Sequence, residues 1–421
     1  MNVVYSSGPV GIDFPEVLLL LGLLLGAAGA LSGWLQNAVL SISVLSVVTG
    51  IALAGAGVID PSPSSEVVVI AVELALILTL FADGLVVERE LLLSHWTPAA
   101  RALVLAMPIT LGLIAIAGKA LFPQLSWAEA LLLGAVLSPT DPVVTSAVVT
   151  SERIPATVRH TLNLESGLND GLALPFVLFF IALATGVGEP VTEAGRLTLE
   201  AGIGAVMGIA VAVLAGRLLA RLPPAAVSPK FEGVYALAIA IASFGLAETT
   251  GWGNGLIAAF VAGIALAVSR HEMPQAFTEF NESVSAIFQI SVFVIFGALV
   301  VTTGWDGSVA RLVLFVAFAL LIARPTAVLL SFTGVQEPRS NKLFIAWFGP
   351  KGVASILFAL LVLASTESHR SLIFDIASFT IVTSIIAHGL TDTVGASWLE
   401  RRLSGGTETV GRRTTGDHPT M

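Results

Sequence analysis

The sequence predicts an all-α membrane protein that crosses the bilayer many times. Charged residues make up 12% of the 421 positions, against about 25% in soluble proteins. Hydrophobic residues account for 55%, and the mean hydropathy is +0.92. Apolar stretches of about 17–25 residues, long enough to span a bilayer as helices, follow one another along nearly the whole chain. These observations exclude an ordinary water-soluble protein, and we expect the lipid bilayer, and no nucleic acid, as its partner.

Charged residues, prolines and glycines divide the apolar stretches into about thirteen candidate helices. They are expected at residues 15–32, 36–57, 67–87, 100–121, 129–150, 161–186, 196–219, 233–250, 254–269, 284–301, 310–331, 342–364 and 372–391. Residues 1–14 contain no Lys or Arg, so we expect the first segment to be a mature helix and not a cleaved signal. The chain has no cysteine, which excludes disulfides and thiolate metal sites.

The distribution of Lys and Arg supports this count. With a cytoplasmic C-terminus, thirteen crossings place the N-terminus outside, and fourteen of the twenty Lys and Arg residues then lie in cytoplasmic segments and four in outer ones. This asymmetry agrees with the positive-inside rule, by which cytoplasmic segments carry an excess of Lys and Arg. We therefore expect a multi-pass protein of the plasma membrane with a transmembrane domain at residues 1–402. Residues 403–421 are rich in Gly, Thr and charge and are expected to form a short disordered cytoplasmic tail.

Two of the predicted helices carry a break at a related place. The fifth contains Pro139 and Pro142 around Thr140-Asp141, and the twelfth contains the run Gly-Pro-Lys-Gly at 349–352. Proline removes a backbone donor, so each break frees polar groups that protein, water or an ion must satisfy. The two helices are seven crossings apart and therefore run in opposite directions. This predicts two inverted six-helix repeats, helices 1–6 and 8–13, with two broken helices that cross near the midplane.

The two breaks also contain charges of opposite sign. Exposed helix ends carry opposed dipoles, and an acid at one end and a lysine at the other would offset them. Asp141 and Lys351 suit these roles. The sequence leaves open which helix ends face each other.

The sixth helix places further polar groups at bilayer depth. Ser166 and Asp170 are four residues apart and share a helix face, as do Glu165 and Asn169. A carboxylate at this depth costs about 2.5–3.5 kcal/mol. Such residues are normally kept for a function.

These groups predict a site for a hard monovalent cation. Oxygen atoms of Asp170, Ser166, Thr140 and Asp141 would form a small cage, and soft or imidazole ligands for a transition metal are missing from it. Asn169 is neutral and can link the two elements by hydrogen bonds. Burial favours the protonated acid at Asp170, whereas a bound cation favours the ionised form, so a proton and a cation compete.

Competition for one site predicts exchange by alternating access, with no cofactor. An unpaired buried carboxylate is expensive, so the site crosses only when it holds one ion or the other. With the neutral Asn169 beside Asp170, we expect one proton per cation. Three alternatives stay open: a K+-selective exchanger, a symporter and a cation channel. An intramembrane aspartyl protease also needs two aspartates, but the lysine in the opposite break has no use in such an enzyme.

Five motifs along the chain resemble the monovalent cation:proton antiporter family, in its electroneutral Na+/H+ exchanger branch. They are Thr140-Asp141-Pro142, Glu165-Ser166-Gly167-Leu168-Asn169-Asp170-Gly171, Arg324-Pro325, Gly349-Pro350-Lys351-Gly352 and His388-Gly389-Leu390-Thr391. The resemblance covers about residues 15–395. It implies a homodimer that exchanges Na+ (or Li+) for protons, in which a core domain, including the helices at 129–186 and 310–391, moves against a dimerising scaffold formed by helices elsewhere.

The resemblance also implies roles for particular residues. It implies that Asp170 binds the Na+ ion, with help from the residues at Thr140, Asp141 and Ser166. Many relatives have arginine where Lys351 stands, and a lysine can titrate where an arginine cannot.

Further residues receive roles from the resemblance or from their positions. The resemblance implies that Glu165 pairs with Arg324 as a structural clamp, and that Glu73, in the third helix, lies near the ion as its equivalent does in some members. Asp83 is interpreted as a funnel-lining or interfacial residue. His388 is interpreted as a hydrogen-bonded structural histidine.

Overall fold

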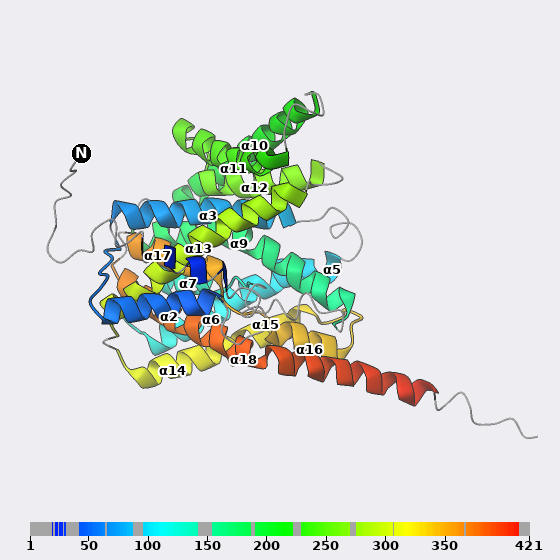
Figure 1. Ribbon diagram of the computed structural model, residues 1–421. Helices are drawn as coiled ribbons and strands as arrows, with labels where there is room; N and C mark the ends of the chain where they lie inside the picture. Colours follow the sequence, from blue (N-terminus) through cyan, green and yellow to red (C-terminus); the bar gives the residue numbers. More distant parts are fainter. Residues whose placement is uncertain are drawn as a thin grey trace, which may run out of the picture.

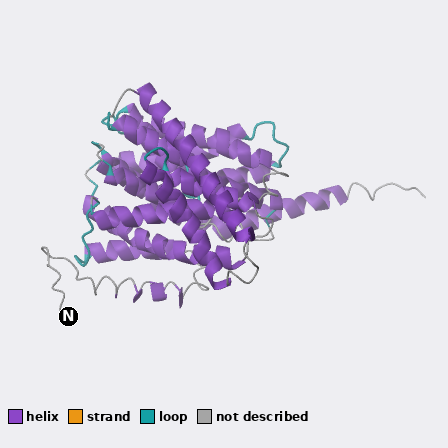
Figure 2. Ribbon diagram, turned by 90° about the horizontal axis from the view of Figure 1, so that it is seen from above, coloured by secondary structure: helices purple, strands orange, loops and turns teal. Residues whose placement is uncertain are grey.

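The computed structural model describes residues 42–63, 65–86, 96–141, 154–186, 190–221, 229–269, 275–305, 307–365 and 368–411, with a few positions between 19 and 30. Within these ranges every regular element is a helix (Figure 1 and Figure 2). Among the described residues, eight helices are long and apolar enough to cross a membrane by length and composition. The predicted all-helical, polytopic class is confirmed.

The observed helices follow the predicted order. They are α2 (Ile42–Gly55), α3 (Glu66–Val86), α5 (Trp96–Arg101), η1 (Ala102–Ala106), α6 (Met107–Leu121), α7 (Trp127–Leu137), α9 (Ala156–Ala184), α10 (Pro190–Arg221), α11 (Pro229–Thr250), α12 (Gly255–Ser269), α13 (Gln275–Thr303), α14 (Val309–Phe318), η3 (Ala319–Ala323), α15 (Arg324–Ser331), α16 (Arg339–Trp347), α17 (Val353–Ala364) and α18 (Arg370–Gly411). Most of the helix expected at 15–32 and the second half of the one expected at 129–150 lie outside the described residues, so the total of thirteen stays a prediction.

Both predicted breaks are present. The fifth helix ends as α7 at Leu137, and residues 138–141 are not helical. The twelfth helix ends as α16 at Trp347 and resumes as α17 at Val353. Ser126 fixes the start of α7, because its side chain accepts a hydrogen bond from the Glu129 backbone while the Glu129 carboxylate accepts one from the Ser126 backbone.

The fourth and eleventh helices share a second irregularity. Each contains a π-helical turn, η1 in one and η3 in the other, and each turn is followed two residues later by a proline, Pro108 or Pro325. Proline cannot donate the usual backbone hydrogen bond, and the widened turn accommodates that loss. The π-helical turns, like the breaks, recur seven helices apart, which supports the predicted pair of repeats.

Packing divides the helices into two groups. In the first group, α2 packs on α13, and α12 packs on α3, α10 and α11. In the second group, α7 packs on α6 and α9, α15 on α16, and α17 on α18. Helices α10, α11 and α12 lie together at one end of the molecule, and α14, α16 and α18 lie at the opposite end (Figure 1). The groups meet where α3 contacts α9 and α17.

This grouping differs from the expected core in one element. The helix expected at 100–121 falls among the helices expected to form the scaffold, yet α6 packs on α7 and α14. Its contacts place it in the second group, with the helices at 129–186 and 310–391. The sequence pattern of an apolar helix does not reveal which neighbours its faces contact.

Glycines bring α3 and α12 into backbone contact. A Cβ atom added at Gly84 would lie 2.5 Å from the Phe260 carbonyl oxygen, and one added at Gly263 would lie 2.4 Å from the Phe81 carbonyl oxygen. Small residues at such positions allow close approach of membrane helices. The contact therefore fixes the C-terminal part of α3 within the first group.

The last helix is longer than the sequence predicts. Composition predicts a disordered tail from residue 403, but α18 continues to Gly411. Leu399 is fully buried and packs in one apolar cluster with Ile154 and Phe344, which holds the helix against the second group beyond the expected end at residue 391. Residues 412–421 lie outside the described part of the chain.

Candidate functional site

The two broken helices cross and bond to each other through their backbones. The Asp141 backbone N–H donates to the Pro350 carbonyl oxygen at 2.9 Å. The Asp141 side chain accepts a hydrogen bond from the backbone N–H of Val353, the first residue of α17, at 2.9 Å. Gly352 permits this contact, because a Cβ atom there would lie 2.2 Å from the Asp141 carboxylate. Asp141 thus places a negative charge at the N-terminus of α17, where the helix dipole favours it.

Lys351 makes the reciprocal contact. Its ammonium group donates to the carbonyl oxygens of Ser138 at 3.3 Å and Pro139 at 3.1 Å, directly after the end of α7. Its backbone N–H donates to the Ser384 hydroxyl on α18 at 2.9 Å. A positive charge therefore meets the C-terminal end of α7, and each break neutralises a helix end of the other.

Asn169 ties α9 to the first break. Its side-chain amide donates to the Thr140 carbonyl oxygen at 3.1 Å and to the Thr140 hydroxyl at 2.8 Å. Ser166 and Asp170 lie one turn apart on α9, and both are buried. The structure thus brings Asn169 to Thr140 at the break, with Ser166 and Asp170 buried on the same stretch of α9.

Asp170 also contacts a residue for which no role at this site was predicted. Its carboxyl group lies close to that of Asp83 on α3, near enough for the two side chains to interact. Asp141 and Lys351 lie within electrostatic reach of Asp170. The signal available in the sequence was an acid inside an apolar helix, but nothing in it indicates that α3 meets α9 at this point.

Glu165 and Arg324 form the expected buried ion pair. Arg324 donates from Nη1 to one Glu165 oxygen at 2.7 Å and from Nη2 to the other at 3.3 Å. The guanidinium lies on Gly349, where an added Cβ atom would come within 1.8 Å of it. Since η3 directly precedes Arg324, the π-helical turn sets the direction of this side chain. The pair links α9, α15 and the second break.

His388 is hydrogen bonded, in line with the interpretation of its role. Its Nδ1 lies 2.7 Å from the Ser384 carbonyl oxygen and its Nε2 lies 3.0 Å from the Trp347 carbonyl oxygen at the end of α16. The ring also stacks on Trp347. These contacts fix α18 against the second break.

Glu73 is not brought to this junction. It is exposed, borders a small crevice between α3, α13 and α17, and precedes Asp83 by ten residues, about 15 Å along the helix axis. Its expected place near the ion therefore finds no support in this arrangement, in which Asp83 is the acid of α3 that meets Asp170.

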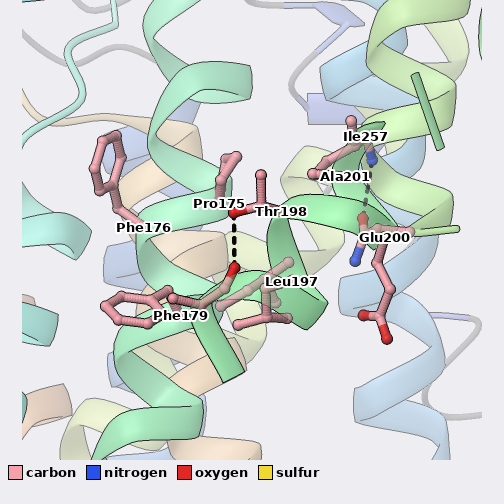
Figure 3. Close-up of a pocket in the computed structure, with 11 residues that line it drawn as sticks. Pro175, Phe176, Phe179, Leu197, Thr198, Glu200, Ala201 and Ile257 are labelled. Atoms are coloured by element: carbon pink, nitrogen blue, oxygen red, sulfur yellow. Dashed lines mark hydrogen bonds between the residues drawn. The ribbon is translucent and has the colours of Figure 1, made fainter. Parts of the chain in front are cut away.

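A larger crevice elsewhere is apolar. It has a volume of about 330 Å³ and lies between α9 and the helices α10 and α12. Figure 3 shows its lining by Pro175, Phe176, Phe179, Leu197, Thr198, Glu200, Ala201 and Ile257. Its carboxylate, Glu200, is paired with Arg196 on the same helix. The crevice thus offers no buried charge for an ion, unlike the junction around Asp170.

Paired broken helices that cross beside buried charges of both signs define a class of protein: the membrane transporters built from inverted repeats. The chain belongs to the sodium/hydrogen exchanger family, because the family described as "Sodium/hydrogen exchanger, transmembrane" matches residues 18–394. The resemblance to the monovalent cation:proton antiporter family, inferred from the five motifs, is confirmed.

Individual relatives agree with this assignment. The K(+)/H(+) antiporter NhaP of Alkalimonas amylolytica is 29% identical over 333 residues, which are 78% of this chain and 57% of that protein. A probable Na(+)/H(+) antiporter of Schizosaccharomyces pombe is 27% identical over 357 residues, 75% of this chain and 46% of that protein. The chain thus spans about half the length of these relatives.

A solved structure has the same fold. The sodium proton antiporter MjNhaP1 from Methanocaldococcus jannaschii, determined at pH 8, superposes with a TM-score of 0.77 over 92% of this chain and 100% of that chain. The two sequences are 20% identical, so this likeness concerns the fold alone.

Proposed function

We propose that this protein is a secondary active antiporter that exchanges Na+ (or Li+) for protons by alternating access. The observation that carries the proposal is the charge balance at the crossing. Asp141 and Lys351 each neutralise a helix end, and Glu165 is paired with Arg324. Asp170 is 6% exposed, and its Oδ1 has no hydrogen-bond partner among the described residues. Its charge is therefore left for a transported ion to balance.

The mechanism follows from this arrangement. A proton or a cation at Asp170 neutralises the carboxylate, and either form can cross because no unpaired charge is buried. Asp170 and the hydroxyl oxygens of Ser166 and Thr140 are the proposed Na+ ligands, and Asn169 holds Thr140 in place. Asp141 neutralises the N-terminal end of α17 at the crossing. Since Asn169 does not ionise, the exchange is one proton for one cation.

The identity of the cation has a second candidate. An oxygen cage also suits K+, and the 29% identical relative is named a K(+)/H(+) antiporter. A K+/H+ antiporter is therefore the alternative. A cation channel is a more distant one, and its flux would rise with ion concentration without saturating.

The proposed setting is the plasma membrane, with the N-terminus outside, the C-terminus cytoplasmic and a role in pH homeostasis. We further propose a homodimer in which the second group of helices moves against the first. The exposed apolar side chains of α10, among them Val191, Leu199, Val206 and Leu214, suit contact with lipid or with a second copy. The proposed reaction is transport without catalysis, and it needs no cofactor.

Ion fluxes in proteoliposomes test this function. Na+, K+ and Li+ are added separately to vesicles with an imposed pH gradient, and saturable Na+-dependent proton movement is expected. Asp170→Asn should abolish it while the protein stays folded, and Asp60→Asn, at an exposed loop position, is the matched control. An Asp170→Asn variant that keeps more than ~10% of the exchange rate would contradict the assignment.

A further inference from the structure

Helix α13 is fixed in the first group of helices by close contact with α2. A Cβ atom added at Gly50 of α2 would collide with the Val294 carbonyl oxygen, and one added at Gly297 of α13 would collide with the Val47 carbonyl oxygen. Glycine at both positions lets the two backbones touch. Thr303, the last residue of α13, therefore moves with α2 and the first group.

The second group makes a polar contact with this end of α13. The Thr303 hydroxyl donates a hydrogen bond to Oδ1 of Asp375, in the second turn of α18, at 2.7 Å. Asp375 is 8% exposed. A hydrogen bond to an ionised carboxylate is stronger than one between neutral groups, and burial strengthens it further. The bond therefore holds together two helices that belong to different groups.

Apolar side chains close the boundary between the groups beside this bond. Phe296 of α13 packs edge to face on Phe374 of α18, with the ring centroids 5.6 Å apart, and both side chains are buried. Leu299, one turn before Thr303, borders the small crevice between α3, α13 and α17, whose volume is about 20 Å³. That is room for little more than one water. The two groups are therefore packed together at this end.

The bond lies on the side of the membrane that the proposed topology places outside. With a cytoplasmic C-terminus, α13 ends and α18 begins at the outer surface. Alternating access exposes the ion site to one side at a time by movement of one group of helices against the other. Opening toward the outside then requires the ends of α13 and α18 to separate.

We propose that the hydrogen bond between Thr303 and Asp375 is a latch that holds the outer side of the transporter closed. The latch breaks each time the ion site opens outward. This inference rests on the proposed function, because it assumes that the groups move during exchange. Loss of the bond removes a contact made only in the outwardly closed arrangement, so the open arrangement gains in population.

Labelling of a single cysteine on intact cells measures this closure. The chain has no cysteine of its own, so Val72→Cys, at a position 4% exposed on the lining of the small crevice, is a reporter for a membrane-impermeant maleimide added outside. Thr303→Val removes the hydroxyl and keeps the shape of the side chain. Thr302→Val is the matched control, because the Thr302 hydroxyl bonds within its own helix, to the Leu299 carbonyl oxygen.

We expect Thr303→Val to raise the labelling rate of the Val72→Cys reporter by roughly tenfold, as for the loss of a hydrogen bond to a charged group, and Thr302→Val to leave it unchanged. In an Asp375→Ala background, Thr303→Val should add nothing, because the bond is already absent. Equal labelling with and without the Thr303 hydroxyl would overturn the inference.

A cross-link distinguishes a latch from a hinge at which the groups turn without separating. Thr303→Cys and Asp375→Cys, combined and joined by a short, reducible thiol reagent, keep α13 on α18. Exchange in proteoliposomes should then fall by roughly tenfold or more relative to the untreated double variant and return on reduction, and treatment of either single-cysteine variant should not change its rate. Undiminished exchange with the link in place would overturn the latch. Absence of exchange in the wild-type protein would instead refute the proposed function.

Discussion

The ion pair between Glu165 and Arg324 gives the sharpest stability prediction. Their side chains are 4% and 7% exposed, and the shorter N–O distance is 2.7 Å. Unit charges this close attract by roughly 6 kcal/mol at an effective dielectric of about 20, and the desolvation of both ions offsets much of that energy. Removal of one partner leaves the desolvation cost of the other without its compensation.

We therefore expect Glu165→Leu and Arg324→Met each to lower the free energy of unfolding by about 3–5 kcal/mol. At ~2 °C per kcal/mol for a long chain, Tm falls by ~6–10 °C. The double variant removes both charges and should recover part of the loss. Thermal unfolding of the four proteins of this cycle, in one detergent, measures the coupling.

A surface pair provides the control for this cycle. Arg196 binds Glu193 and Glu200 on α10 with its side chain 49% exposed, so Arg196→Gln should change the free energy of unfolding by less than ~1 kcal/mol. Additive losses in the Glu165→Leu, Arg324→Met double variant would refute the reasoning, because independent residues show no coupling.

Three further predictions concern the crossing and the exchange. Gly352→Ala should displace Asp141 from the start of α17 and slow exchange by roughly tenfold or more. Gly112→Ala is the control: no atom lies within 4 Å of the added Cβ, so exchange should keep the wild-type rate. Ser166→Ala removes a neutral oxygen ligand and should raise the Na+ KM with little change in kcat; an unchanged KM would remove Ser166 from the site. One-for-one exchange should be insensitive to voltage. A K+/valinomycin clamp moved from zero to about 100 mV, a step worth ~2.3 kcal/mol per net charge moved, should therefore leave the exchange rate unchanged. A steady transport current would contradict electroneutrality.

The parts of the fold predicted from the sequence are those that depend on local chemistry. Prolines and glycines locate the breaks at 138–141 and 348–352, because they forbid regular helix hydrogen bonds in any surroundings. The pair of Glu165 with Arg324 was implied by the resemblance to the family, and the structure contains it. The helix ranges followed from segment length and punctuation.

The parts that were not predicted depend on which surfaces meet. Asp83 has no local feature that distinguishes it from an interfacial acid, and its contact with Asp170 exists because Gly84 and Gly263 hold α3 where α9 passes. The same limit applied to Asp141 and Lys351. Their opposite charges predicted that each would offset a helix dipole, but which helix end each one faces is visible only in the structure of the crossing.

The direction of the Arg324 side chain depends on the number of residues in the π-helical turn η3. Its five residues, Ala319–Ala323, directly precede the arginine. Deletion of one of them would allow an ordinary α-helix with better hydrogen bonding, and each residue of such a helix turns the side chain that follows by about 100°. Arg324 would then point away from Glu165. The variant with the more regular helix would lose the ion pair, since the π-helical turn sets the rotation about the helix axis that brings Arg324 to Glu165.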